Sequence, residues 1–235
     1  TLTIDSVVFS DNQSTSSGGA VFFNRGFTSI RNSTFTNNQA DFGGAILGSQ
    51  FVPNVGNGEI VNSTIAGNKA TSFGGGMYTN VSHIQVLSST IAGNVADSDD
   101  AGGGSGGGTY NGGADAAAFT VANTIYAGNK VGTISPVNNQ CGGAHTSSGY
   151  NLRSTSEVEC TGFTGTGDVV NVTPLIGSLG DNGGPTPTIP LLNDSPAIDA
   201  GNTASGPARR REASGQAASS AGDHRHGRAR VRAVV

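Results

Sequence analysis

The chain has few of the residues on which helical domains and catalytic centres are usually built. Its 235 residues include no tryptophan, one methionine and two cysteines, and aromatic residues make up only 6%. No run of eighteen apolar residues occurs, which excludes a transmembrane helix. No window carries the apolar stripe of an amphipathic helix over more than one turn. Helical and membrane-spanning folds are therefore not expected.

Charge is also scarce, because charged residues make up 12% of the chain and only two of them are lysines. In residues 1–208 acidic residues outnumber basic ones by 14 to five, whereas residues 209–235 hold seven arginines and two acids. Phosphate binding requires clustered lysine and arginine. The acidic body therefore argues against a nucleic-acid partner.

Nearly the same nine residues occur five times. Each block begins with a β-branched aliphatic residue and ends in asparagine, and successive blocks start 26, 30, 26 and 35 residues apart. The blocks are IDSVVFSDN from Ile4, IRNSTFTNN from Ile30, IVNSTIAGN from Ile60, VLSSTIAGN from Val86 and VANTIYAGN from Val121. A period of this length indicates one supersecondary unit stacked on copies of itself.

The repeats predict an all-β fold, a right-handed single-stranded parallel β-helix. Ile, Val, Thr, Phe and Ser dominate the blocks, as suits half-buried strands, and a glycine pair or run follows four of them. We expect two or three short strands per repeat, with coils about 4.8 Å apart. Residues 1–135 then form five coils, with Ile30, Ile60 and Val86 directly above one another. Residues 136–202 form terminal coils and a less regular, proline-rich cap.

Asparagines recur at two positions of the block and predict ladders along the stack. At corners they tolerate positive φ, and stacked asparagine side chains can hydrogen-bond to one another. One position has Ser6 and Ser88 as exceptions, and the other is the last residue of the block. The predicted ladder residues are Asn12, Asn32, Asn38, Asn62, Asn68, Asn94, Asn123 and Asn129.

Cys141 and Cys160 both lie beside glycine-rich turns. For a chain that folds in an oxidising compartment, this pair predicts one disulfide, closing a loop at the end of the β-helix. A zinc site is not expected, because two thiols and a distant His145 lack the usual ligand spacing.

Asp97, Asp99 and Asp100, with Asp115 further on, form the densest group of carboxylates. Calcium prefers such oxygen ligands, so this loop is the one candidate metal site, and no other cofactor is expected. The segment lacks the glycine and the closing glutamate of an EF-hand loop. Solvated loop acids are therefore the alternative interpretation.

Two stretches resemble known families. A glycine pair followed by alanine and an aliphatic residue alternates with Phe-x-x-Asn at Phe9–Asn12 and Phe35–Asn38, and this pattern resembles the repeats of chlamydial polymorphic outer-membrane proteins. A second set of motifs resembles the closing module of bacterial choice-of-anchor Q proteins. Its members are Gly149–Leu152, Cys160, Thr173–Ile176, Asp181–Thr188 and Asp194–Asn202. These resemblances imply a surface protein in which β-helix coils precede a sorting signal, and they imply no enzymatic activity.

Residues 203–235 depart from that second pattern. Where members of the family usually continue with an Asp-Gln-Arg-Gly sequence, this chain has Pro207–Glu212 and then an Ala/Gly/Arg-rich run. We expect an irregular tail that packs poorly on the coils, as a shifted reading frame would produce. A genuine basic tail that binds an anionic surface is the alternative.

These observations predict a non-catalytic bacterial module, secreted or on the cell surface, for adhesion, extracellular structure or assembly. An extracellular glycan or a surface protein is the expected partner, bound by loops such as the insertion from Asp97 to Ala118. Self-association through exposed coil ends is also expected. The chain starts at Thr1 with no signal peptide or anchor, so we expect it to be a mature or trimmed segment.

Two other functions remain open. A polysaccharide lyase or glycoside hydrolase needs converging carboxylates or a basic residue beside acidic groups. Asp5 and Arg31 share one block position, but the next blocks have Val61 and Leu87 there, so no catalytic residue is assigned. Arg25 and Arg31 are the residues that could mark an anionic sugar site. Ice binding needs a flat threonine lattice. The residues that align for such a lattice are Thr34, Thr64 and Thr90, beside Ser33, Ser63 and Ser89.

Overall fold

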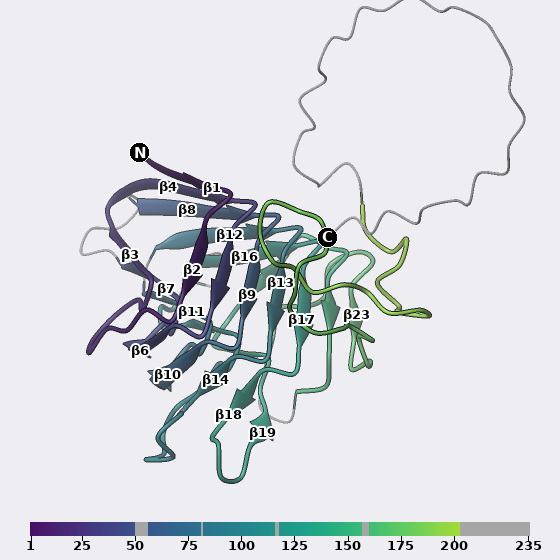
Figure 1. Ribbon diagram of the computed structural model, residues 1–235. Coiled ribbons are helices and arrows are strands. Elements are labelled where there is room, and N and C mark those ends of the chain that lie inside the picture. Colours follow the sequence, from purple (N-terminus) through teal and green to yellow (C-terminus); the bar gives the residue numbers. More distant parts are fainter. Residues whose placement is uncertain (50–55, 81, 116–117, 157–159, 203–235) are drawn as a thin grey trace, which may run out of the picture.

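The computed structural model describes residues 1–49, 56–80, 82–115, 118–156 and 160–202. Parallel strands stack into a β-solenoid of about five turns, and the described residues contain no α-helix (Figure 1). The predicted all-β parallel β-helix is confirmed. The tail lies outside the described residues, so the expectation that it packs poorly stays a prediction.

Four sheets run along the solenoid. Sheet A contains β1 (Leu2–Asp5), β4 (Gly26–Arg31), β8 (Gly56–Val61), β12 (His83–Leu87), β16 (Phe119–Ala122) and β21 (Thr146–Ser147). Sheet B contains β2 (Val8–Ser10), β5 (Thr34–Thr36), β9 (Thr64–Ala66), β13 (Thr90–Ala92), β17 (Ile125–Ala127), β22 (Leu152–Arg153) and β23 (Val169–Val170).

Sheet C contains β6 (Gln39–Phe42), β10 (Lys69–Phe73), β14 (Val95–Ala96), β18 (Lys130–Val131) and β19 (Val137–Asn138). Sheet D contains β3 (Val21–Asn24), β7 (Ile46–Ser49), β11 (Met77–Asn80), β15 (Thr109–Asn111) and β20 (Cys141–Gly142). Each of coils two to four therefore has four strands, rather than the predicted two or three. The strands that were not anticipated are those of sheet C, which precede the glycine pair.

The register of sheet A follows the sequence blocks. Ile30 pairs with both Ile4 and Ile60, and Val86 pairs with Ile60 and Val121. The predicted alignment of Ile30, Ile60 and Val86 is confirmed. From Ile30 onward these inward-facing side chains are fully buried, and each coil buries the apolar face that it could not bury alone.

The glycine pair marks a corner at which two backbones approach closely. Gly43 has a φ of 62°, and a Cβ on Gly44 would lie 2.2 Å from the carbonyl oxygen of Gly75 in the next coil. Glycine tolerates both the positive φ and the contact. The pair therefore allows the coils to stack at the corner between sheets C and D.

Beyond β23 the chain folds back along the side of the solenoid. Figure 1 shows this green segment in front of the sheet that contains β13 and β17. Apolar side chains of the segment pack on the outer face of sheet B, and Thr34 Oγ1 donates to the carbonyl oxygen of Pro187 at 2.5 Å. The apolar contacts join Ile176, Leu179, Ile189, Leu191 and Ala197 to Ala66, Ala92, Ile125, Ala127 and Leu152.

This packing covers the threonine array considered for ice binding. Thr34, Thr64 and Thr90 align in the register of sheet B, as expected, but their exposed fractions are 0%, 4% and 1%. An ice-binding face must be flat and open to solvent. The expectation of such a face here is wrong, because sequence spacing does not reveal which later segment covers an outer surface.

Candidate functional site

The last asparagine of each block points into the solenoid and forms a continuous ladder. The backbone N–H and Nδ2 of Asn38 both donate to Oδ1 of Asn68, each at 2.9 Å, and Asn68 donates in the same way to Asn94. The ladder begins at Asn12 and continues through Asn129 to Gln140, whose Oε1 replaces the asparagine oxygen. Gln140 was not anticipated, because it lies outside the five blocks.

The second asparagine position forms a corner with left-handed backbone. Asn32, Asn62 and Asn123 have φ values of 50°, 49° and 50°, and the exceptions Ser6 and Ser88 share this conformation. Asn62 Nδ2 donates to Asn32 Oδ1, but Asn123 instead exchanges hydrogen bonds with Asn202. The structure therefore links only part of this second set.

A third ladder is made of serines and was not predicted from the sequence. The backbone N–H of Ser33 donates to Oγ of Ser63, and that of Ser63 donates to Oγ of Ser89. Each hydroxyl in turn donates to the carbonyl oxygen two residues earlier in its own coil. The signal was the serine that recurs after the corner position, which we had considered only as part of an ice-binding lattice.

The carboxylates proposed for calcium accept hydrogen bonds from their own loop or from the turn between β18 and β19. Asp97 accepts from the N–H of Gly102, and Asp99 accepts from the N–H of Ala101. Asp100 accepts from the hydroxyl and N–H of Thr133, which lowers the pKa of its carboxyl. Asp115 was expected near these three residues, but its Oδ2 lies 3.1 Å from Nε2 of His83.

No group of three or more His, Cys, Asp or Glu side chains that could hold a metal ion occurs among the described residues. Calcium binding by this loop gains no support from the geometry.

Two of the charged residues considered for a carbohydrate-processing enzyme, Arg31 and Asp5, contact neighbouring side chains. Arg31 forms an ion pair with Glu59, and Asp5 accepts hydrogen bonds from Asn32 and Ser6, which lower the pKa of its carboxyl. Arg25 is exposed in a turn with positive φ. This arrangement supplies no converging pair of carboxylates around a substrate cleft.

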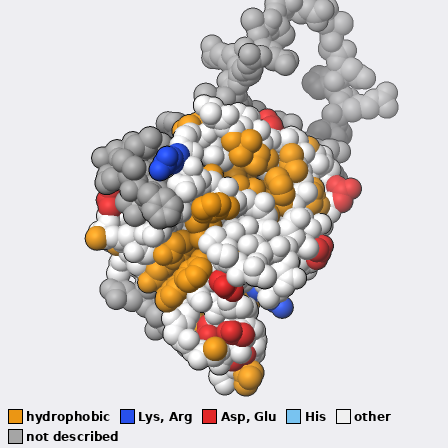
Figure 2. All heavy atoms as spheres, turned by 90° about the vertical axis from the view of Figure 1, so that its left-hand side faces the viewer, with side chains coloured by type: hydrophobic (Ala, Val, Ile, Leu, Met, Phe, Trp, Pro, Cys, Tyr) orange, Lys and Arg blue, Asp and Glu red, His pale blue; other side chains and the backbone are white. Residues whose placement is uncertain are grey.

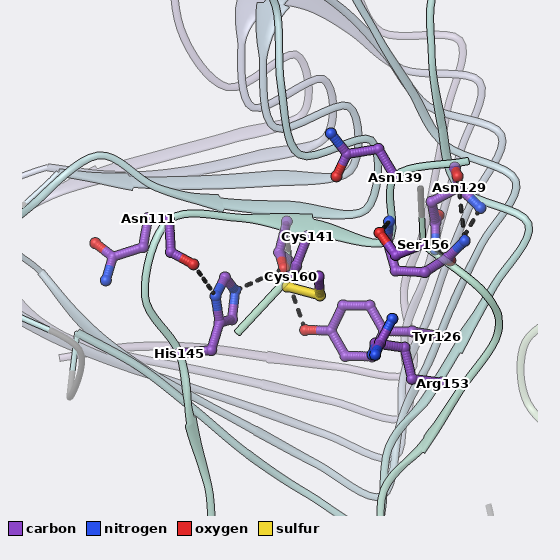
Figure 3. The surroundings of a disulfide bond; sticks show 12 residues. Asn111, Tyr126, Asn129, Asn139, Cys141, His145, Arg153, Ser156 and Cys160 are labelled. Atoms are coloured by element: carbon purple, nitrogen blue, oxygen red, sulfur yellow. Dashed lines mark hydrogen bonds between the residues drawn. A yellow bond between two sulfur atoms is a disulfide. The ribbon is translucent and has the colours of Figure 1, made fainter. Parts of the chain in front are cut away.

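As predicted, the two cysteines form a disulfide. The bond lies at the end of the stack, beyond the last full coil. Cys141 occupies the inward position held by Thr109 in the preceding coil. Figure 3 shows His145, Tyr126 and Arg153 around this bond. Within the part of the chain that the structure describes, both cysteines are in the disulfide.

His145 is buried beside the disulfide and has two hydrogen-bond partners. Its Nδ1 lies 3.1 Å from the carbonyl oxygen of Gly143, which can only accept, so Nδ1 carries the proton of the neutral ring. Its Nε2 lies 2.9 Å from Thr109 Oγ1, and the ring stacks on Phe119. Burial lowers the pKa of His145 to about 4, so the ring is neutral at neutral pH.

Acid is therefore expected to destabilise the last coils. The unfolded chain takes up a proton at its ordinary histidine pKa of about 6.5, whereas folded His145 resists until about pH 4. Stability is thus highest above pH 6.5 and falls by about 3 kcal/mol between the two values. Urea unfolding from pH 4 to 8 measures this loss. The His145→Gln variant should remove most of this slope, and an unchanged slope in that variant would exclude His145 as its source.

Aromatic rings gather on the outside of the solenoid at the glycine corner. Phe42 and Phe73 precede the glycine pair in consecutive coils, and Tyr78 and Tyr110 follow it in sheet D. Their ring centroids are 4.6–6.2 Å apart between neighbours, and all four rings are partly exposed. We call these four residues the aromatic stripe. Alternation in sheet D explains the exposure of the two tyrosines, since their neighbours Met77 and Thr109 point inward and are buried.

The surroundings of the aromatic stripe are mostly polar, and they include the exposed Lys69 at the start of β10, four residues before Phe73. On the outer face of sheet D, equivalent positions are occupied by Asn24, Ser49 and Asn80. Each of them lies two residues after Phe22, Leu47 or Tyr78, respectively. On the other side, Thr71 Oγ1 donates to Asp41 Oδ1 at 2.8 Å. The sequence signal for the aromatic stripe was the aromatic residue on each side of the glycine pair.

The insertion from Asp97 to Ala118 contributes to the same face. Binding by its loop residues stays a prediction, but part of the insertion is regular structure. Gly106 and Gly107 form the fourth glycine corner, and Thr109–Asn111 forms β15, which places Tyr110 beside Tyr78. Residues 116–117 lie outside the described residues.

Comparison with known proteins gives one match. Residues 6–24 and 32–49 match the Chlamydia polymorphic membrane protein repeat, each spanning part of a block and the following glycine corner. Searches of curated proteins and of solved structures returned no match. No helix of the described residues is long and apolar enough to cross a membrane. The chain is thus a β-solenoid whose first two coils carry repeats similar to those of polymorphic membrane proteins.

Proposed function

We propose that this chain is a non-catalytic adhesion module, secreted or displayed on a bacterial surface, that binds a neutral glycan along the aromatic stripe. The observation that carries this proposal is the row of partly exposed rings Phe42, Phe73, Tyr78 and Tyr110, which spans coils two to four. Polar side chains flank the stripe on both sides. They are Asn24, Ser49 and Asn80 in sheet D, and Asp41 and Thr71 in sheet C. The similarity of residues 149–202 to a choice-of-anchor Q closing module is part of the proposal and stays a prediction.

Sugar rings present faces of C–H bonds, whose partial positive charge is attracted to the negative face of an aromatic ring. Hydroxyl groups at the edge of a sugar need donors and acceptors, which Asn24, Asn80 and Asp41 supply beside the stripe. Binding sites of this kind combine an apolar surface with a few placed polar groups. Since the carboxylate of Asp41 lies beside the stripe and would repel an anionic sugar, a neutral glycan fits better than an anionic one.

Location outside the cytoplasm rests on two observations. The first two coils match a repeat of polymorphic membrane proteins, and a disulfide joins Cys141 to Cys160. Disulfides persist chiefly in oxidising compartments. A rigid coil stack with a row of rings on its outer face suits the recognition of an extended polymer.

We expect the double variant Tyr78→Ala/Tyr110→Ala to lose at least about tenfold in affinity, which corresponds to about 1.4 kcal/mol. Depletion of the protein from solution by insoluble cellulose, chitin or mannan measures the affinity. Phe27→Ala is the matched control, because Phe27 is 41% exposed on sheet A and lies outside the aromatic stripe. Equal retention of the double variant and the wild type would contradict the assignment of the stripe.

A further inference from the structure

The two tyrosines of the aromatic stripe lie over glycines of the next coil. A Cβ on Gly112 would be 2.8 Å from Cζ of Tyr78 and closer still to its Oη. A Cβ on Gly142 would be 2.6 Å from Cδ2 and 2.9 Å from Cε2 of Tyr110, its register partner in sheet D. Each ring therefore occupies the space that a side chain at its glycine would fill.

Neither of these glycines is required by the backbone. Gly112 and Gly142 do not have positive φ, so an L-residue could adopt their conformation. The atoms nearest to the added Cβ belong to side chains, those of the two tyrosines and of Ser105. At the glycine corner, by contrast, the nearest atoms are backbone atoms of the next coil. Gly112 and Gly142 thus accommodate the rings and not the stacking of the coils.

The two seated rings form a platform that follows the solenoid axis. Tyr78 and Tyr110 are register partners in the parallel strands β11 and β15, so one is displaced from the other along the axis. Their planes differ by 8°, their centroids are 5.8 Å apart, and both rings are partly exposed. A ring that leans over the next coil presents its face to solvent as well as its edge.

The phenylalanines of the stripe stand along one side of this platform. The ring of Phe42 is inclined by 62° to that of Tyr78, and the ring of Phe73 is inclined by 42° to that of Tyr110. On the other side, the exposed Asn80 follows Tyr78 by two residues. Figure 2 looks from the side that carries β3 and β6 in Figure 1, and it shows a band of hydrophobic side chains on that surface.

We propose that Gly112 and Gly142 are positioning residues that hold Tyr78 and Tyr110 as a platform for an extended β-linked glycan, whose chain runs along the solenoid axis. This inference rests on the proposed function, because it names the substrate class of the same site. Chains of the cellulose, chitin or mannan type are straight ribbons, and each sugar advances by a step close to the spacing of two coils. Successive sugars can therefore place a C–H face on each tyrosine. Helical α-linked chains curve away from a straight row.

Calorimetric titration of the whole chain with soluble oligosaccharides tests the substrate class. We expect at least one of cellohexaose, mannohexaose and chitohexaose to bind at least about tenfold more tightly than α-linked maltohexaose. The reason is that only an extended chain contacts both tyrosines at once. Maltohexaose binding as tightly, or a protein depleted by an insoluble polysaccharide that binds none of the β-linked oligomers, would overturn this inference alone. No binding to any glycan would overturn the proposed function as well.

The Gly142→Ala variant tests the seat of Tyr110. Its added Cβ meets side chains only, so we expect the variant to fold, as circular dichroism on heating would show, and to bind the β-linked oligomer about fivefold more weakly. Gly184→Ala is the matched control, since its Cβ has ordinary clearance, and it should bind like the wild type. If Gly142→Ala does not fold, Gly112→Ala replaces it, with Tyr78 as the displaced ring.

A double-mutant cycle separates positioning from a general structural effect. In a Tyr110→Ala background there is no ring to displace, so Gly142→Ala should weaken binding no further. The corresponding background for Gly112→Ala is Tyr78→Ala. Equal weakening with and without the tyrosine, or no weakening by the glycine variant alone, would contradict the positioning role.

Discussion

Replacement of Asn68 by leucine is expected to remove about 4 kcal/mol of stability, or to prevent folding altogether. The side chain is fully buried, and its oxygen accepts both the backbone N–H and Nδ2 of Asn38, while its Nδ2 donates to Asn94 and to the carbonyl oxygen of Phe35. Leucine has a similar volume but offers no partner to these groups. Each buried polar group left without a partner costs about 1–3 kcal/mol.

Urea unfolding followed by circular dichroism measures this loss, with Asn24→Leu as the control because Asn24 is exposed on the outer face of β3. The control should change stability by less than about 0.5 kcal/mol. An Asn68→Leu protein as stable as the control would show that the interior ladder does not stabilise the stack. A domain of ordinary stability has only about 5–15 kcal/mol in total, so the expected effect is large.

The second large effect is expected from Gly44→Ala. A Cβ at this position would lie 2.2 Å from the carbonyl oxygen of Gly75 and 2.4 Å from that of Lys69. Both are backbone atoms of the next coil, held by the hydrogen bonds of sheets C and D, so neither can move without separating two coils. We expect a loss of more than about 3 kcal/mol, by the overpacking mechanism.

Thermal unfolding of Gly44→Ala and Gly184→Ala provides the comparison. Gly184 has ordinary clearance, since the nearest atom to its added Cβ is 3.6 Å away. Both variants replace one glycine by alanine, so both lower the conformational entropy of the unfolded chain by the same amount. Equal transition temperatures would mean that the coils are not in close contact at the glycine corner.

The repeating part of the fold could be predicted because one physical cause acts in every coil. A β-branched residue at Ile30, Ile60 and Val86 can be buried only if the next coil covers it, and this requirement sets the register. The asparagine at the end of the block likewise recurs because each side chain completes the hydrogen bonds of its neighbour. A fixed period therefore carries three-dimensional information.

The remaining features depend on contacts that no period records. The segment after β23 covers Thr34, Thr64 and Thr90, and some of its partners are distant in sequence, since Thr34 and Pro187 are 153 residues apart. The aromatic stripe combines residues before and after the glycine corner from three coils. The path of the backbone around that corner places the ring centroids of Phe73 and Tyr110 4.6 Å apart.

The central claim is that the solenoid binds a neutral glycan without cleaving it. One incubation tests both parts, when the wild-type protein is mixed with each insoluble polysaccharide, the bound fraction is measured, and reducing ends in the supernatant are counted. We predict depletion of the protein by at least one polysaccharide, with no more reducing ends than in the protein-free control. New reducing ends that increase with time, or no depletion by any polysaccharide, would contradict the claim.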